Sequence, residues 1–176
     1  GVNELKAWAL EYLGQIDEQM KAKELQARYE AEKIDITLPA EMTEEALNKI
    51  LSGERVVYML NGDRMSVCEF ENDAECVVYT TENKGFILEI LSGSIPKITF
   101  AAKLHYHFAF ENNTVLNNLS FDCEIAAYLL DPSASDYNIE KLCFRYDSPY
   151  FKQAEENAEL VSLVKLYEVL KKKTKW

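Results

Sequence analysis

The sequence has 176 residues, 48% of them hydrophobic, and 30 acidic against 19 basic side chains give it a net charge of −11. No apolar run approaches the roughly 20 residues that span a bilayer, so we exclude a membrane protein. Nucleic-acid affinity comes mainly from Lys and Arg on phosphates, so we expect weak or no DNA binding by the chain alone.

The chain begins at Gly1 and ends at Trp176, just after a predicted helix, so we expect an excised fragment of a longer protein. No basic and apolar leader precedes the first helix, and we expect a cytoplasmic location. The cysteines lie in apolar contexts without C-x-x-C spacing. They are predicted to be buried thiols, not disulfides or zinc ligands: Cys68, Cys76, Cys123 and Cys143.

The first 33 residues are predicted to form a helix or helical linker, and residues 34–176 a separate domain. Apolar residues recur at three- and four-residue steps, which indicates an amphipathic helix. From residue 17 to residue 33 Glu and Lys dominate, so this half is expected to be a solvated helix or a linker. The apolar positions are Leu5, Trp8, Ala9, Tyr12, Leu13, Ile16 and Met20.

The next segments alternate between strands and helices. Residues 34–38 are typical of a strand that Pro39 ends, and Thr43 is a suitable N-cap for a helix that reaches residue 51. The apolar run 55–60 predicts a central strand covered on both faces. Turn signals then separate strands at 65–70 and 76–80, so we expect three adjacent antiparallel strands.

The rest of the chain is mainly helical. Residues 82–91 predict a helix and residues 97–100 a strand; a helix from about Ala102, an Asn-rich turn and a helix from Cys123 to Asp131 follow. A short helix is expected at 138–146. The final helix carries an apolar stripe: Leu160, Leu163, Val164, Tyr167 and Leu170.

Residues 96–132, PKITFAAKLHYHFAFENNTVLNNLSFDCEIAAYLLDP, carry a more specific pattern. A Lys-hydrophobic pair opens one helix and an FD-x-x-x-A-A-Y-L-L-x-P run forms the next. This pattern resembles the proofreading-exonuclease module of family A DNA polymerases. The resemblance covers about residues 34–170. It implies an α/β, ribonuclease-H-like exonuclease fold, with a mixed, mostly antiparallel-meander sheet flanked by helices and an extra N-terminal helix.

Such exonucleases use two divalent metals about 4 Å apart, held by carboxylates from separate elements. The resemblance places the first motif, Asp-x-Glu, on the strand with Met59 and Asn61, where no acid occurs. The second motif acid is replaced by His105. The third falls at about Asn157, next to the lone carboxylate of Glu156.

Other polar residues have simpler interpretations. Residues two apart on a helix do not share a face, so His105 and His107 are expected to be partly buried or surface side chains, not a metal pair. Asp63 is expected to cap a turn. Asp122 matches the Asp of the FD motif and is expected to cap the helix that begins at Cys123.

We therefore expect no catalytic, cofactor-binding or metal-binding residue in this chain, and no enzyme activity of its own. The resemblance implies a vestigial 3′→5′ exonuclease-like domain of a bacterial DNA polymerase I, whose polymerase module it positions in DNA replication and repair. The parent would be a nucleotidyltransferase. The implied partners are the polymerase and 5′-nuclease domains of the same parent chain, with DNA bound through the parent. The first helix is then either a connector to the upstream nuclease or an exposed helix.

Two alternatives remain. One is a stand-alone protein-interaction domain with an exonuclease-derived fold, which docks through its first helix. The other is an active metal-dependent exonuclease with relocated ligands, for which the candidates are Asp63, Glu69 and Glu156.

Overall fold

The computed structural model describes residues 1–31, 35–36, 39–70 and 75–175, and at residues 25–31, 35 and 70 the backbone alone. The chain divides into two compact units, Gly1–Lys33 and Ile34–Trp176. Within the described ranges, no helix combines the length and apolar character that a bilayer-spanning segment needs.

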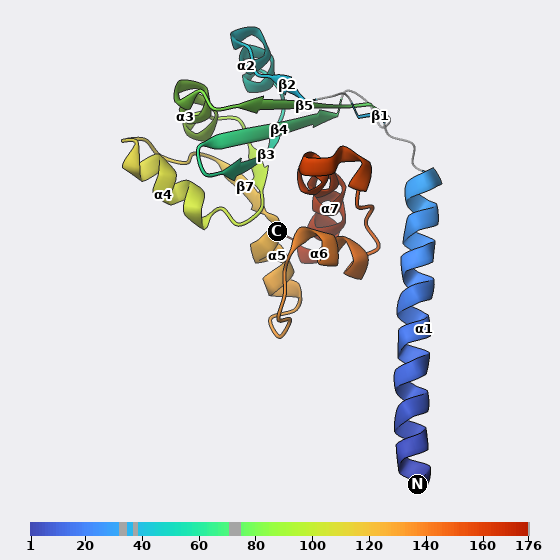
Figure 1. Cartoon of the computed structure of the whole chain (residues 1–176). Helices are drawn as coiled ribbons and strands as arrows, with labels where there is room; N and C mark the ends of the chain where they lie inside the picture. The colour runs from blue at the N-terminus through green and yellow to red at the C-terminus, as the bar shows by residue number, and fades with distance from the viewer. Residues whose placement is uncertain (32–34, 37–38, 71–74, 176) are drawn as a thin grey trace. The chain divides into compact units, whose positions relative to one another are not determined.

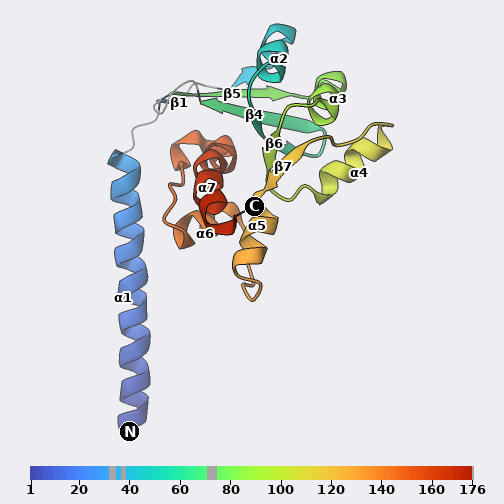
Figure 2. The same cartoon turned by 180° about the vertical axis from the view of Figure 1, so that it is seen from behind.

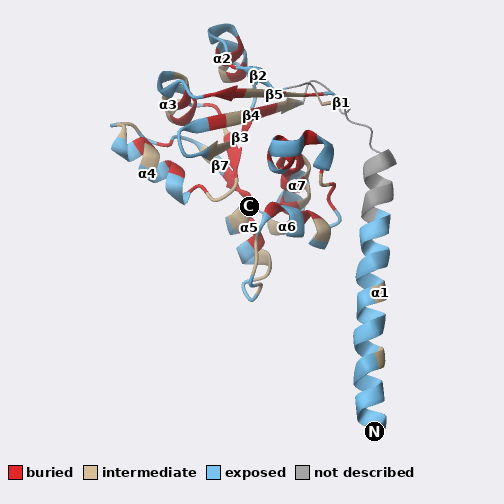
Figure 3. Cartoon of the chain, in the orientation of Figure 1, coloured by how far each residue is buried: buried red, intermediate tan, exposed pale blue. Residues whose placement is uncertain are grey.

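The first unit consists of helix α1 (Val2–Ala31), which runs without a break through Gly14. The helix predicted at the start of the chain is therefore present, and the acidic and basic stretch that follows continues it up to residue 31. The rings of Trp8 and Tyr12 stack with their centroids 5.4 Å apart. Most described side chains of α1 are exposed, as the pale blue ribbon shows (Figure 3).

The second unit is built on a mixed sheet with the strand order β1-β5-β4-β3-β6-β7, in which β2 also pairs with β5. The predicted antiparallel meander is confirmed, since β4 pairs antiparallel with both β3 and β5. All other pairings are parallel. The strands are β1 (Asp35–Ile36), β2 (Ala40–Glu41), β3 (Val56–Asn61), β4 (Arg64–Phe70), β5 (Glu75–Thr81), β6 (Lys97–Thr99) and β7 (Leu119–Asp122).

Two short strands were not predicted, and one predicted strand is described only in part. The strand expected at 34–38 is described only at Asp35–Ile36, and its other residues lie outside the described ranges. The short strands β2 and β7 were not predicted. β7 follows an Asn-rich turn and has only four residues, too few for a recognisable alternation.

The helices follow the capping signals in the sequence. Thr43 accepts a hydrogen bond from the Ala46 N–H at 3.1 Å, and Asn83 accepts one from the Phe86 N–H at 3.2 Å. The helix predicted at 82–91 therefore begins two residues later than expected. The helical segments are α2 (Glu44–Leu51), α3 (Lys84–Ser92), α4 (Lys103–Glu111), α5 (Cys123–Leu130), α6 (Ile139–Arg145), the 3₁₀ helix η1 (Lys152–Asn157) and α7 (Ala158–Thr174).

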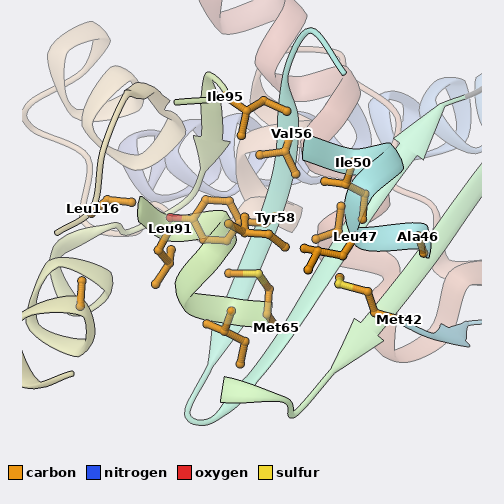
Figure 4. Packing of buried hydrophobic residues seen from close by; sticks show 14 of the residues in the cluster. Met42, Ala46, Leu47, Ile50, Val56, Tyr58, Met65, Leu91, Ile95 and Leu116 are labelled. Carbon is orange, nitrogen blue, oxygen red and sulfur yellow. The ribbon is translucent and has the colours of Figure 1, made fainter. Parts of the chain in front are cut away.

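Helices cover both faces of the sheet (Figures 1 and 2). On one face, α2, α3 and α4 enclose an apolar core together with β3 and β4 (Figure 4). Because side chains alternate along a strand, Val57 points to the opposite face, where it lines a hollow with Val164 of α7. The labelled core residues are Met42, Ala46, Leu47, Ile50, Val56, Tyr58, Met65, Leu91, Ile95 and Leu116.

Helix α7 is the main cover of this second face and contacts β3, β4, α5, α6 and η1. All five residues of its predicted apolar stripe are buried. Val161 and Leu166 are buried as well, so the buried part of α7 is wider than one stripe. This follows from its position, because other helices pack around it in addition to the sheet.

Lys97 is a fully buried cation that joins two connections of the fold. Its Nζ donates hydrogen bonds to the backbone carbonyls of Gly93 at 2.6 Å, Ile95 at 3.0 Å and Asn117 at 2.7 Å. Burial lowers the pKa of Lys97 to about 8, so at neutral pH the side chain is mainly an ammonium. Its three N–H bonds then match three acceptors, and the end of α3 is tied to the turn before β7.

We predict that Lys97→Met lowers the free energy of unfolding by roughly 2–4 kcal/mol, because three backbone carbonyls, one buried and two partly buried, lose their donor. Urea denaturation at neutral pH measures this loss. The control is Lys103→Met at the exposed start of α4, which should change stability by no more than about 0.5 kcal/mol. Equal small losses in both variants would show that the Lys97 contacts contribute little.

Candidate functional site

The strand β3 occupies the place of the first exonuclease motif and carries no carboxylate. Met59 lies opposite Ser66 and is partly buried, and Asn61 lies opposite Arg64 and is exposed. Asp63 follows in the turn to β4, where it is also exposed, and Gly62 beside it adopts a φ of 60° that suits glycine. This strand therefore carries a thioether and an amide at the positions where the resemblance places the two acids of the first motif.

His105 occupies the place of the second motif acid and is deeply buried. The expectation of a partly buried or surface side chain was wrong for this residue, which is 4% exposed. Its Nδ1 is hydrogen bonded to the Tyr58 hydroxyl at 2.9 Å, and the two rings lie 5.2 Å apart. His107 is exposed, as expected, and its Nε2 lies 3.0 Å from the Glu111 carboxylate. The two histidines thus lie on different faces of α4.

The bond between Tyr58 and His105 joins two neutral groups at neutral pH. Burial lowers the pKa of His105 to about 4, although the negative charge of Asp122 opposes this shift. Burial also raises the pKa of Tyr58 well above its ordinary value. No local sequence signal predicted this contact, because Tyr58 lies within a continuous apolar run and is 47 residues away from His105.

Asn157, at the place of the third motif acid, is 5% exposed and precedes α7. Its Nδ2 is buried and has no hydrogen-bond partner among the described residues. Asn157 lines a hollow of about 140 Å³, to which Met59, Asn61 and His105 do not contribute. The four residues at the motif positions therefore do not line a common hollow. The lining residues are Ile36, Pro39, Val78, Gln153, Ala154, Glu155, Glu156 and Asn157.

Asp122 caps α5 as expected and has a second role that was not predicted. Its carboxylate accepts hydrogen bonds from the backbone N–H groups of Glu124 at 2.9 Å and Ile125 at 3.4 Å. It also accepts from Ala101 at 3.1 Å and Ala102 at 2.9 Å, which precede α4. Asp122 is 2% exposed. A buried carboxylate with four backbone donors has a structural role, and its oxygens are already engaged.

The acids proposed as relocated ligands lie apart. Glu69 lines a hollow of about 300 Å³ with Cys68 and Val164 and lies 3.9 Å from the Lys49 ammonium. Glu156 lines the separate hollow around Asn157, and Asp63 is exposed in its turn. Within the described residues, no group of three or more His, Cys, Asp or Glu side chains is arranged to hold a metal ion.

Solved structures with a similar fold include nucleic-acid enzymes. One is the POL domain of Pol1 from M. smegmatis in complex with DNA primer-template and dNTP, with a TM-score of 0.56 and 19% identity over 76% of this chain and 27% of that one. Another is the apo form of a nuclease, with a TM-score of 0.54 and 13% identity over 80% of this chain and 81% of that one. At these identities the likeness concerns the α/β fold alone.

The family follows from the sequence. The family model described as DNA polymerase I, ribonuclease H-like domain, matches residues 67–157, just over half of the chain. The chain therefore belongs to this family, and the resemblance seen in residues 96–132 is confirmed. DNA polymerase I of Caldicellulosiruptor bescii is 27% identical over 173 residues, which cover 92% of this chain and 20% of that protein. The chain thus spans about a fifth of the length of this relative.

We predict that His105 makes the stability of the fold depend on pH. Its pKa of about 4 in the folded chain lies below the value of about 6.5 for an unperturbed histidine. As the pH falls through this window, the unfolded chain binds a proton that the folded chain does not bind. The stabilisation is therefore complete above about pH 6.5 and falls by up to roughly 3 kcal/mol on reaching about pH 4.

Urea denaturation at several pH values between about pH 7 and pH 4 measures this dependence. Over this pH range the free energy of unfolding of His105→Gln should fall by up to roughly 3 kcal/mol less than that of the unmodified chain, since glutamine does not titrate. His107→Gln is the matched control, because its side chain is exposed, and it should follow the original curve. Parallel curves for His105→Gln and the unmodified chain would contradict the prediction.

Proposed function

We propose that this chain is a catalytically inactive 3′→5′ exonuclease-like domain of a DNA polymerase I. The observation that carries the proposal is the bond between His105 and Tyr58. At the position where the family resemblance expects a metal-binding acid, a neutral imidazole is buried and hydrogen bonded to a phenol. Its Nδ1 is engaged by the Tyr58 hydroxyl, and the neutral ring supplies neither the charge nor the oxygen ligand that magnesium requires.

The other two motif positions support the same proposal. Two-metal catalysis requires carboxylates from separate elements to meet at two ions. β3 offers Met59 and Asn61, and Asn157 lies in a different hollow. Asp122 is engaged by four backbone donors and is not available as a substitute ligand.

The role we propose is structural. The residues 34–176 form an exonuclease-like domain that holds the polymerase module in place relative to an upstream 5′-nuclease, and residues 1–33 form the connecting helix. The net charge of −11 suits this role, because an acidic domain repels DNA and leaves it to the polymerase cleft. DNA contact then occurs through the parent protein, in the cytoplasm, during replication and repair.

A nuclease assay tests the inactivity. We expect the chain to release no nucleotides from 3′-labelled single-stranded DNA with Mg²⁺ or Mn²⁺, and to give no binding heat when titrated with Mn²⁺. Glu156→Ala and Asp63→Ala should likewise release no nucleotides and give no binding heat. Metal-dependent cleavage that Glu156→Ala abolishes would show that the ligands have moved and the domain is active.

The structural role is tested in the parent polymerase. Removal of residues 34–176 should lower the melting temperature of the polymerase and shorten its products, while single-nucleotide incorporation persists, because positioning and chemistry are separate. Lys103→Met, a change at an exposed position within the domain, is the control and should keep product length. If the deletion changes neither melting temperature nor product length, the positioning role is wrong.

A further inference from the structure

Two cysteines face each other across the meander, on the face of the sheet that α7 covers. Cys68 lies on β4 and Cys76 on β5, and their Sγ atoms are 2.7 Å apart. In the strand register Cys68 opposes Val78 and Cys76 opposes Phe70, so the two cysteines are diagonal neighbours. Both are reduced and buried, with 4% and 0% of their surface exposed.

The contact between these sulfur atoms is close for two thiols. A disulfide joins its sulfur atoms at about 2.05 Å, so a small side-chain movement brings Cys68 and Cys76 to bonding distance. Strand pairing on both sides already fixes the two backbones. The contact with Cys76 and burial both raise the pKa of Cys68, which keeps Cys68 mainly as a thiol at neutral pH.

A hollow of about 300 Å³ gives small molecules a route to this pair. Cys68 lines it together with the apolar side chains of Val57 and Val164 and the charged residues Glu54, Arg55 and Glu69. The lining of this hollow thus combines apolar and charged groups. Cys123, at the start of α5, and Cys143, within α6, are buried on other elements and do not line it.

We propose that Cys68 and Cys76 form a modification site that a low-molecular-weight disulfide converts to an intrachain disulfide. The Cys68 thiol loses its proton to solvent and its sulfur attacks one sulfur of the reagent, whose other half leaves and is protonated as a thiol. The Cys76 sulfur, after losing its proton, then attacks Cys68 Sγ and releases the second half as a thiol. The protein dithiol is oxidised by two electrons, and the reagent is reduced to two thiols.

This inference is independent of the proposed function, since it depends on the sheet alone. In reducing compartments persistent disulfides are rare, and those that form are usually transient and redox-sensing. A link between β4 and β5 would fix the centre of the meander covalently, and thiols would reverse it. The site therefore makes the packing of this sheet responsive to the thiol–disulfide balance of its surroundings.

Mass spectrometry of the folded chain tests the proposal, with cystamine as the disulfide. The reduced chain is treated under native conditions, quenched with acid, unfolded and alkylated, and digested with trypsin. Cleavage after Arg64 and Lys84 places Cys68 and Cys76 in one peptide, and cleavage after Lys103, Lys141 and Arg145 separates Cys123 from Cys143. We expect the peptide 65–84 to lack two hydrogens and carry no alkyl group, while Cys123 and Cys143 are alkylated.

Two variants serve as controls. In Cys68→Ser the peptide 65–84 should never lose two hydrogens, and in Cys123→Ser it should do so as readily as in the unmodified chain. The proposal is overturned if the unmodified chain keeps two alkylatable thiols in 65–84, or if Cys68 stops at a mixed disulfide with cystamine. It is also overturned if Cys123 and Cys143 are oxidised to the same extent. These readouts come from the unmodified chain, so they stand even if Cys68→Ser fails to fold.

Discussion

The arrangement of α4 and α5 depends on one buried carboxylate. Asp122 ends β7 and accepts hydrogen bonds from the first turn of α5 and from the two residues that lead into α4. Ala101 adopts a φ of 59°, a left-handed conformation that costs an alanine about 1 kcal/mol. Its N–H group reaches the carboxylate in that conformation, so the hydrogen bonds offset the strain. Two neighbouring parallel strands, β6 and β7, thus direct their following helices through a single side chain.

The Tyr58–His105 pair lies beside this junction and shows how a metal-site position can be integrated into a core. A cluster of acids at such a depth is tolerated only when cations neutralise it, because isolated buried charges are costly. A neutral imidazole with a phenol partner removes this requirement. Tyr58 also belongs to the apolar cluster on its face of the sheet. His105, where the resemblance places the second motif acid, is therefore part of the packing of this face.

Much of the fold follows from local sequence signals. Asn61-Gly62-Asp63 specified the turn between β3 and β4, and capping residues such as Thr43 and Asp122 marked helix starts. The absence of acids at the motif positions that the resemblance indicates could also be read from the sequence, because it depends only on residue types. The short strands β2 and β7 were missed because two or four residues carry no periodicity, and their pairing partners lie far away in the chain.

Local sequence signals could not predict contacts between residues that lie far apart in the chain. The burial of His105 depends on Tyr58 from another element, and the second pair of donors to Asp122 comes from residues about twenty positions earlier. The proximity of Cys68 and Cys76 depends on the register of β4 and β5, which a one-residue slip would destroy. Sequence context indicated that the cysteines would be buried and that Asp122 would cap a helix, but only the three-dimensional pairing identified their partners.

The lengths of the outermost strands have a consequence for behaviour in concentrated solution. As described, β7 at one border of the sheet has four residues, and β1 and β2 at the other have two each. Unpaired backbone groups along a long border would invite another chain to add a strand and start aggregation. Borders this short offer few such groups, so the domain can keep a wide sheet at its centre without presenting a template for polymerisation.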